Sequence, residues 1–336
     1  MKTIGIDIGG ANTKIASADG EIIELHYVPL WKDTRLPEAL EEIAEKHSPD
    51  RVSVVMTGEL ADCFEDKMAG IKFIMESVEQ AFNCEIRYID SNGHFYDGSG
   101  DLRKLAAANW AASANLIGSE IGDCIFVDMG STTSDIIPIK SGKHMAELTD
   151  FSRLIRSELV YAGVLRTNLA YLLDSLDLAS GKCRVSSELF ATTADVYLLL
   201  GDISEEVYTC ETADGAGKSK TDAMRRIARV VCADLTEISP DEIYRIAEQV
   251  REKQVILLSE AIAQVAERNE LSTIVSAGLG EFLIREAAKR LGFEWTSVAQ
   301  RWGEEISKVF PAYAAARMFE ADVSARDDKA EDEETS

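Results

Sequence analysis

Two glycine turns, about 120 residues apart, carry the side chains with which this chain could do chemistry. The first turn lies in residues 4–14 (IGIDIGGANTK), directly after a short apolar run. Because glycine permits tight turns and close backbone approach, the N–H groups of such a turn can form a concavity that binds phosphate. The alternative is an ordinary glycine hairpin. The candidate phosphate ligands are Gly9, Gly10, Asn12, Thr13 and Lys14.

The second turn, in residues 126–136 (FVDMGSTTSDI), has the same form. Asp128 stands two residues before its glycine, as Asp7 does in the first turn. A carboxylate repels phosphate, so both aspartates are predicted to hold a divalent metal ion, through water where needed. Two such turns would close over one polyphosphate from opposite sides, with the metal ion between them. The candidate phosphate ligands here are Gly130, Ser131, Thr132 and Thr133.

A third glycine turn stands late in the chain, in residues 273–283 (TIVSAGLGEFL). Gly278 and Gly280 would let a ring or a phosphate group lie against the backbone and the N-terminus of the following helix. Arg226 and Arg229 share one predicted helix and are further candidate ligands for a diphosphate or a carboxylate, because charged N–H donors suit such oxyanions. Salt bridging to neighbouring acidic residues is the alternative for both arginines.

The elements around the first two turns form an internal repeat. Strand, turn, strand, turn and strand follow one another in residues 4–27 and again in residues 123–148. Such self-similarity indicates a duplicated structural unit. Thr13 of the first copy matches either Thr133 or Ser134 of the second. The region that follows is predicted to be a mostly helical insertion at about 150–272, with helices over 152–177, 186–200, 218–236 and 239–268.

Together the three turns resemble the phosphate-1, phosphate-2 and adenosine motifs of the actin-like ATPase superfamily, in that order and across residues 1–320. Within it the chain is most similar to the hydantoinase/oxoprolinase branch, whose GGTxTD-like hairpin corresponds to residues 130–135. Met129 stands where that pattern has a glycine, and Ser131 replaces a further small residue. The segments that resemble the methanofuran-biosynthesis members of this branch are 56–71, 106–114, 188–201 and 213–234.

This resemblance implies an α/β fold with two RNase-H-like lobes of the actin/Hsp70 type around a ligand cleft. The first lobe would comprise residues 1–118 and a C-terminal helix at 311–320. The second would comprise residues 119–310 and would carry the helical insertion. Residues 321–336 are acidic and poor in apolar side chains, so they are predicted to form a disordered tail.

Members of the methanofuran branch in methanogens join an aminomethyl-furanmethyl diphosphate to the phenol of γ-glutamyltyramine and release pyrophosphate. The resemblance therefore implies a transferase with Mg²⁺ as cofactor, with no need for ATP, and with a diphosphate and a phenolic amine as small-molecule partners. A phenol with a pKa of about 10 needs a base to attack well at neutral pH. Asp7, Glu59 and Asp135 are candidates, and the sequence does not choose among them. For Glu59 the alternative is a surface loop.

Two other functions fit the same motifs. One is an ATP-dependent small-molecule kinase or a hydantoinase/oxoprolinase-type ATPase, although this chain is shorter than hydantoinase subunits usually are. The other is a non-catalytic, nucleotide-binding regulator. An activator of this fold that carries an iron–sulfur cluster would need paired cysteines, which this sequence lacks.

Composition narrows the partners further. A net charge of -24 repels nucleic-acid phosphates and anionic lipid, so neither is an expected partner. The six cysteines include no CxxC pair and the four histidines no HxxxH pair, which indicates a reduced cytoplasmic protein without a zinc site. The N-terminus enters a strand without a signal peptide, and no apolar run reaches about 18 residues. A homo-oligomer is left open.

Overall fold

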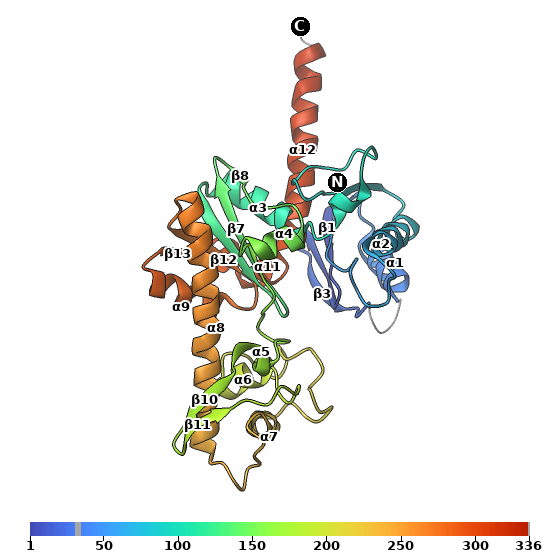
Figure 1. The fold of residues 1–336 in the computed structure, drawn as a ribbon. Coiled ribbons are helices and arrows are strands. Elements are labelled where there is room, and N and C mark those ends of the chain that lie inside the picture. Colours follow the sequence, from blue (N-terminus) through green and yellow to red (C-terminus); the bar gives the residue numbers. More distant parts are fainter. Residues whose placement is uncertain (31–34, 335–336) are drawn as a thin grey trace. The chain divides into compact units, whose positions relative to one another are not determined.

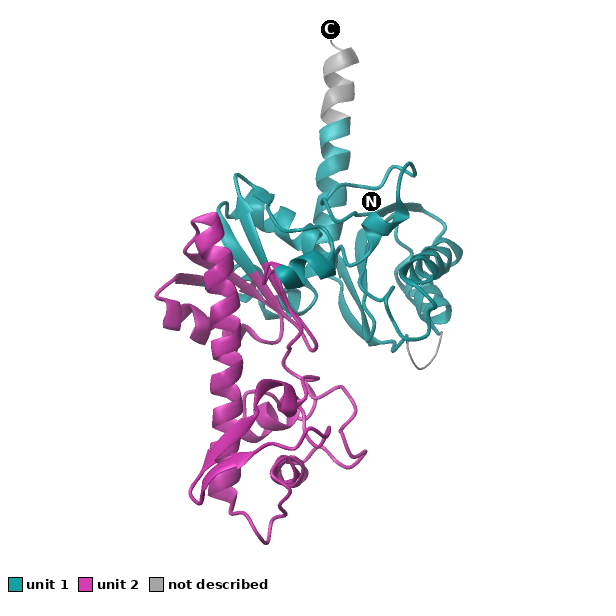
Figure 2. Ribbon diagram, in the orientation of Figure 1, with its two compact units in different colours: residues 1–126, 137–155, 296–336 teal, residues 127–136, 156–295 magenta. Residues whose placement is uncertain are grey.

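The computed structural model describes residues 1–30 and 35–334, with side chains up to residue 326. The chain divides into two compact units (Figure 2). The predicted division at residue 118 differs from this one, because part of the second repeat packs within unit 1, where β8 (Lys143–His144) contacts α3 (Asn109–Glu120). Unit 1 comprises Met1–Phe126, Ile137–Ile155 and Thr296–Ser336, and unit 2 comprises Val127–Ile136 and Arg156–Trp295.

Unit 1 contains a five-stranded sheet of order β3-β2-β1-β4-β5, of which β1 and β3 are labelled in Figure 1. Strand β1 is antiparallel to β2 and parallel to β4, so the C-terminal ends of β1 and β4 meet at the same edge of the sheet. Strand β3 is antiparallel to β2, and β5 is parallel to β4. The strands are β1 (Thr3–Ile8), β2 (Asn12–Ser17), β3 (Ile23–Tyr27), β4 (Arg51–Met56) and β5 (Glu85–Tyr88).

Alternation along β1 sorts its side chains between two layers. The three isoleucines of β1 belong to one apolar core with buried side chains of α1 (Leu36–His47) and α2 (Lys67–Ala81). Gly5 faces the other layer, where an added Cβ would lie 1.8 Å from the carbonyl oxygen of Ala312 in α12 (Phe310–Glu334). A glycine is therefore required at position 5, because the backbone of α12 packs directly on the strand.

Helix α12 is longer than the sequence predicts. We expected it to end at residue 320 and disorder to follow, but it continues to Glu334. Arg87 of β5 pairs with Asp322 at 2.5 Å, and Asp322 also pairs with Arg326, one turn further along the helix, at 2.9 Å. These ion pairs favour helix beyond the apolar part of the segment. Residues 335–336 of the predicted tail lie outside the described residues.

The second sheet has the order β13-β12-β6-β7-β8, and β9 also pairs with β7. Counted within each copy of the repeat, both sheets therefore run third, second, first, fourth and fifth strand. This shared topology confirms the predicted duplication and the RNase-H-like α/β fold. The further strands are β6 (Cys124–Met129), β7 (Ser134–Lys140), β9 (Leu159–Val160), β12 (Thr273–Ala277) and β13 (Glu294–Ser297).

The insertion is less helical than predicted. The expected helix over residues 152–177 is wrong, since α4 (Asp150–Ile155) is followed by β9, α5 and β10. Two parts of this stretch pair as strands instead, β9 with β7 and β10 with β11. Helix α8 agrees with its predicted range. The elements are α5 (Leu169–Leu172), β10 (Ser175–Leu178), β11 (Gly181–Arg184), α6 (Thr193–Leu200), α7 (Lys220–Arg229) and α8 (Pro240–Asn269).

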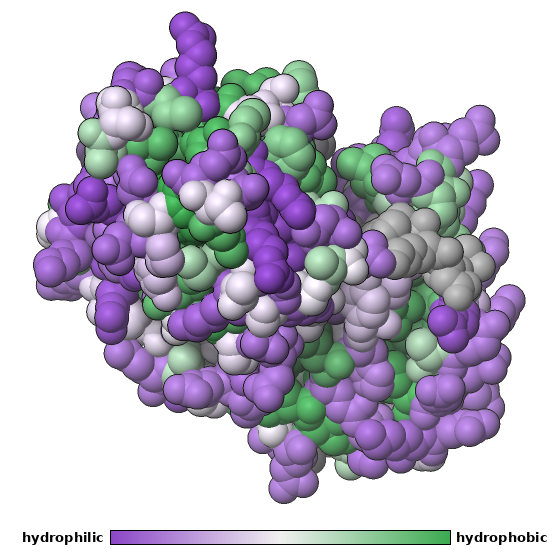
Figure 3. Space-filling view, turned by 90° about the horizontal axis from the view of Figure 1, so that it is seen from below, coloured by the Kyte–Doolittle hydropathy of each residue, from purple (hydrophilic) through white to green (hydrophobic). Residues whose placement is uncertain are grey.

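The remaining elements of the described residues are three helices and one 3-10 turn. In the part of the chain that the structure describes, no helix is both long and apolar enough to cross a membrane. Figure 3 shows one face of the molecule, on which hydrophilic residues predominate, as the net charge of -24 leads one to expect. The remaining elements are α9 (Glu281–Leu291), α10 (Val298–Trp302), α11 (Glu304–Lys308) and the 3-10 turn Leu102–Leu105.

Candidate functional site

The first glycine turn joins β1 to β2 and directs its carbonyl groups into the protein. The N–H of Gly9 donates to the carbonyl of Asn12 at 2.9 Å, and the carbonyl of Gly10 accepts from the N–H of Leu30 at 2.9 Å. Within residues 1–30 and 35–334, the N–H groups of Gly10 and Ala11 donate to no backbone carbonyl. A turn whose carbonyls are used and whose amides are not is suited to an anion.

The second glycine turn joins β6 to β7 and repeats this geometry. The N–H of Gly130 donates to the carbonyl of Thr133 at 2.9 Å. The carbonyl of Ser131 accepts from the N–H groups of Leu165 and Arg166, each at 3.0 Å. No backbone acceptor among the described residues takes the N–H of Ser131 or of Thr132. The two turns thus offer the same pair of amides, as the duplication predicts.

The matching hydrogen bonds fix which residues of the two copies are equivalent. Gly9 corresponds to Gly130, so Asp7 corresponds to Asp128 as predicted. The same register makes Ser134 the partner of Thr13 and excludes Thr133, which takes the place of Asn12. Ser134 is buried, and its hydroxyl donates to the carbonyl of Ala162 at 2.8 Å, so the hydroxyl makes a hydrogen bond within the protein.

Asp7 is buried at the C-terminal end of β1, with 1% of its surface exposed. Its Oδ2 pairs with the Nζ of Lys14, on the neighbouring strand, at 3.1 Å, whereas its Oδ1 is buried without a hydrogen-bond partner. The hydroxyl of Thr13 is also buried and without a hydrogen-bond partner. Lys14, a predicted phosphate ligand, therefore compensates the charge of Asp7, and the Oδ1 of Asp7 could still accept a ligand. Thr13 pairs with Ile8, so its side chain lies on the other face of the sheet.

The carboxylates suit a magnesium ion that keeps most of its water. Among the described residues, no three His, Cys, Asp or Glu side chains are grouped closely enough to hold a metal ion by themselves. Magnesium is usually bound by one or two carboxylates together with water and substrate phosphates. The unpartnered Oδ1 of Asp7 is an oxygen ligand of the kind that magnesium prefers. Asp128, the equivalent residue in unit 2, is partly exposed at the end of β6.

The third glycine turn packs against the end of β6. A Cβ added to Gly278, whose φ is +84°, would lie 2.3 Å from the Oδ1 of Asp128. A Cβ added to Gly280 would lie 2.4 Å from the Sδ of Met129, and the N–H of Gly280 donates to the carbonyl of Met129 at 2.9 Å. The structure therefore brings the predicted residues Asp128, Gly278 and Gly280 together in unit 2, at the place where the second turn begins.

Glu59 is buried, so the surface-loop alternative is wrong. It follows β4 with 1% of its surface exposed, and its Oε2 has no hydrogen-bond partner. The N–H of Gly58 donates to the carbonyl of Ile8 at 3.0 Å, which ties this segment to the end of β1. Burial raises the pKa of the Glu59 carboxyl to about 6, the carboxylate of Asp150 adds to this, and the ammonium group of Lys67 opposes it.

Asp135 is the third carboxylate predicted as a base. It lies on β7, partly exposed, in the position that Lys14 has in the first copy, and it is paired in the sheet with Leu159 of β9. The duplication therefore does not make Asp135 a second copy of Asp7. Its catalytic role stays a prediction.

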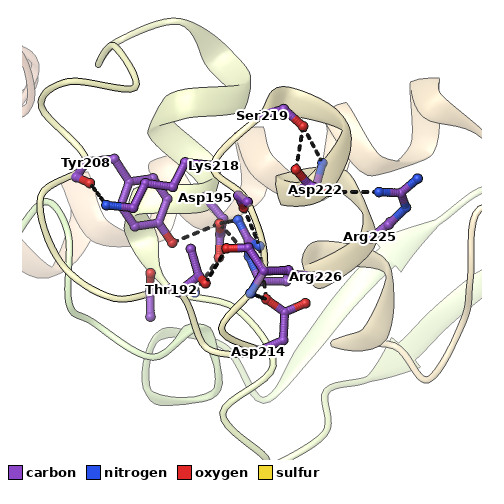
Figure 4. Close-up of polar contacts among 12 residues, drawn as sticks. Thr192, Asp195, Tyr208, Asp214, Lys218, Ser219, Asp222, Arg225 and Arg226 are labelled. Carbon is purple, nitrogen blue, oxygen red and sulfur yellow. Dashed lines mark hydrogen bonds and ion pairs between the residues drawn. The ribbon is translucent and has the colours of Figure 1, made fainter.

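The structure contradicts Arg226 as a phosphate ligand. Its side chain is fully buried and donates to Asp195 at 2.7 and 2.9 Å, to Asp214 at 3.1 Å and to the carbonyl of Gly217 at 3.0 Å (Figure 4). Four of the five donors of a guanidinium group are thus used inside the insertion. Arg229 pairs with Asp214 at 2.8 Å. Salt bridging, the alternative that the sequence left open, is the arrangement observed for both.

Sequence reasoning did not single out Arg153, a buried cation of unit 1. Its guanidinium carbon lies 4.6 Å from the ring centroid of Trp110, and its Nη1 lies 3.5 Å from the Oδ1 of Asp150, the residue that acts on the pKa of Glu59. The spacing of Asp150 and Arg153 on one short helix predicts only a surface pair. The spacing reveals neither that Arg153 is buried nor that the carboxylate of Asp150 acts on Glu59.

Comparison with known proteins identifies the family of the chain. Residues 50–322 match the family model described as hydantoinase/oxoprolinase. The chain belongs to the hydantoinase/oxoprolinase family. A relative from Methanocaldococcus jannaschii, named (4-{4-[2-(gamma-L-glutamylamino)ethyl]phenoxymethyl}furan-2-yl)methanamine synthase, is 39% identical over 94% of this chain and 97% of its own. A protein of the same name from Methanococcus vannielii is 38% identical over 61% of this chain and 94% of its own.

Two solved structures of low sequence identity are also similar to this family member. A ROK family glucokinase from Streptomyces griseus is 14% identical, with 95% of this chain and 99% of the other covered and a TM-score of 0.48. The activator of the 2-hydroxyisocaproyl-CoA dehydratase from Clostridium difficile is 12% identical, with 97% and 98% covered and a TM-score of 0.46.

Proposed function

We propose that this protein is an ether-forming transferase of methanofuran biosynthesis. It joins an aminomethyl-furanmethyl diphosphate to the phenol of γ-glutamyltyramine and releases pyrophosphate in the cytoplasm. The observation that carries the proposal is the 39% identity, over 94% of this chain, with a synthase whose name describes a phenoxymethyl-furan product. Such a product contains the ether bond that this reaction would form.

The glycine turns supply what the leaving group needs. As the bond between the furan methylene carbon and the diphosphate oxygen breaks, negative charge grows on the diphosphate, and donors that bind it there lower the barrier. Each turn offers two such donors, the amides of Gly10 and Ala11 in the first turn and those of Ser131 and Thr132 in the second. At each turn an aspartate, Asp7 or Asp128, would hold Mg²⁺, which would supply positive charge to the diphosphate. This chemistry consumes no ATP.

Glu59 is the best of the three candidate bases. Because burial raises its pKa to about 6, it is mostly ionised at neutral pH and is a stronger proton acceptor than an ordinary carboxylate. Asp7 is already paired with Lys14. In the proposed step, Glu59 takes the phenolic proton and the phenolate oxygen bonds to the methylene carbon. The electron pair of the breaking bond leaves with pyrophosphate.

One assay tests the proposal. The protein is incubated with Mg²⁺ and either ATP or the furan diphosphate plus γ-glutamyltyramine. Pyrophosphate and ether formed only from the second pair support the transferase. Formation of ADP from ATP would contradict the transferase and support the kinase or ATPase. Nucleotide binding without any turnover would contradict the transferase and support the regulator.

Two variants test the assigned turn within the same assay. Asp128→Ala and Thr133→Ala should each lower the rate strongly, whereas Thr236→Ala, an exposed threonine outside the turn, should leave it unchanged. Wild-type turnover in both of the first two variants would show that the second turn does not hold the diphosphate.

A further inference from the structure

Gly163 lies directly against the second glycine turn, on the peptide group that joins Ser131 to Thr132. A Cβ added to Gly163 would lie 2.5 Å from the carbonyl carbon of Ser131 and 2.5 Å from the nitrogen of Thr132. Only a glycine can approach one face of a peptide group so closely. The carbonyl oxygen of the same peptide is held by the N–H groups of Leu165 and Arg166, each at 3.0 Å. The direction of the Thr132 N–H is thus fixed from two sides.

The carbonyl of Gly163 accepts three side-chain hydrogen bonds. They come from the Nε2 of Gln254 at 2.9 Å, the Oγ1 of Thr193 at 3.1 Å and the Oγ1 of Thr167 at 3.2 Å. The Oγ1 of Thr167 also accepts from the N–H of Gly163 at 2.8 Å. A carbonyl oxygen has two lone pairs, so three donors exceed the usual number of partners. The three donors therefore restrict the position of the Gly163 carbonyl oxygen. Together they fix the position of Gly163 over the turn.

The three donors belong to the insertion, and the buried hydroxyl of Tyr197 fixes the side-chain amide of one of them, Gln254. Gln254 lies on α8, and Thr193 and Tyr197 lie on α6. The hydroxyl of Tyr197 donates to the Oε1 of Gln254 at 2.5 Å, and both side chains are at most 1% exposed. Both ends of the Gln254 amide are therefore used, which leaves a single orientation for its Nε2. Fully satisfied buried networks of this kind rigidify the structure around them.

Helix α8 also holds the helix that follows the third glycine turn. Arg251, three residues before Gln254, pairs with Asp202 at 3.2 Å and with Glu286 of α9 at 2.5 Å. Residues three apart lie on the same face of a helix. One face of α8 thus contacts the supports of both glycine turns of unit 2, the turn at Gly130 through Gly163 and the turn at Gly280 through α9.

We propose that Gln254, Thr193 and Thr167 are positioning residues of the diphosphate site, which act through Gly163 to aim the N–H of Thr132 at a phosphoryl oxygen. The insertion is then a support for the binding turn, and its helices need not touch substrate. This inference rests on the proposed function, since it takes the second turn to be a diphosphate site.

The test measures the binding of inorganic pyrophosphate with Mg²⁺ by calorimetry, together with KM for each substrate. Gln254→Leu removes one donor to the carbonyl of Gly163 and should weaken pyrophosphate binding by up to about tenfold, because at most the free energy of that one buried hydrogen bond is lost from the positioning of the turn. Thr193→Val should act in the same direction, and Thr193→Ser, which keeps the hydroxyl, should restore binding. KM for the diphosphate should rise, whereas KM for the phenol should not change.

Ser259→Ala is the matched control, because the hydroxyl of Ser259 is buried on the same helix and donates to the carbonyl of Val255, within that helix, at 2.7 Å. It should lower thermal stability and leave pyrophosphate binding unchanged. If Gln254→Leu does not fold, the comparison of Thr193→Val with Thr193→Ser tests the positioning role by itself. Wild-type protein that neither binds pyrophosphate nor forms the ether would refute the proposed function. Wild-type protein that binds, together with variants that bind equally well, would overturn only the positioning role.

Discussion

Replacing Glu59 by glutamine should make the enzyme slower and the protein more stable at the same time. Glutamine keeps the shape of the side chain but cannot take a proton, so loss of a general base should lower kcat by roughly 10²–10⁴-fold. Raising the pKa of a carboxyl from its ordinary 4.5 to about 6 corresponds to about 2 kcal/mol against the ionised folded state, at about 1.36 kcal/mol per pH unit. Glu59→Gln should recover about that amount at pH 8.

The sign of the pH dependence follows from the raised pKa. Between pH 4.5 and about 6 the folded protein holds the Glu59 proton more tightly than the unfolded chain does, so the wild type loses stability as the pH rises through this window. Below pH 4.5 the carboxyl is neutral in both states, and the wild type and Glu59→Gln should be equally stable. The rate should change in the opposite direction, because only the ionised carboxylate can accept the phenolic proton.

Two measurements check these expectations. Melting temperatures from pH 4 to pH 8 should diverge above pH 4.5, with Glu59→Gln a few degrees higher at the alkaline end. The logarithm of kcat/KM should rise with pH to a plateau, with its midpoint near pH 6, in the wild type only. Glu45→Gln, at an exposed position of α1, is the control and should leave both curves unchanged. A Glu59→Gln enzyme with wild-type kcat would refute the base, and one that is less stable at pH 8 would refute the argument from burial.

Two further predictions concern the metal ion and the insertion. Chelation of divalent metal should abolish ether formation, and added Mg²⁺ should restore it; full activity of the metal-free protein would contradict the role given to Asp7 and Asp128. Arg226→Met leaves the buried charge of Asp195 without its partner, so it should destabilise the fold by about 3–5 kcal/mol while the folded fraction keeps its KM for the diphosphate. A raised KM with unchanged stability, measured by denaturant unfolding, would instead make Arg226 a ligand.

The glycine turns and the duplication were predictable from the sequence. Each turn depends on a few consecutive residues: an aspartate, one or two glycines, and hydroxyl or amide side chains. Its form can therefore be predicted from a short stretch of sequence. The repeated order of strands around the turns at Gly9 and Gly130 then predicted two sheets of the same topology, which the structure confirms. The register between the copies was only half determined, because Thr133 and Ser134 are both hydroxyl residues and hydrogen bonds are needed to tell them apart.

Burial and pairing were decided only by the tertiary structure. The pKa of Glu59 is raised because the protein around this side chain excludes water, and the residues next to it in sequence do not predict its burial. Arg226 looked like an anion ligand until its acidic partners, up to 31 residues away in sequence, were placed beside it. Gly163 is one glycine among 22, and its role depends on Gln254, which is 91 residues away in sequence. Sequence determines a backbone turn locally, whereas desolvation and hydrogen-bond partners arise only when distant segments pack.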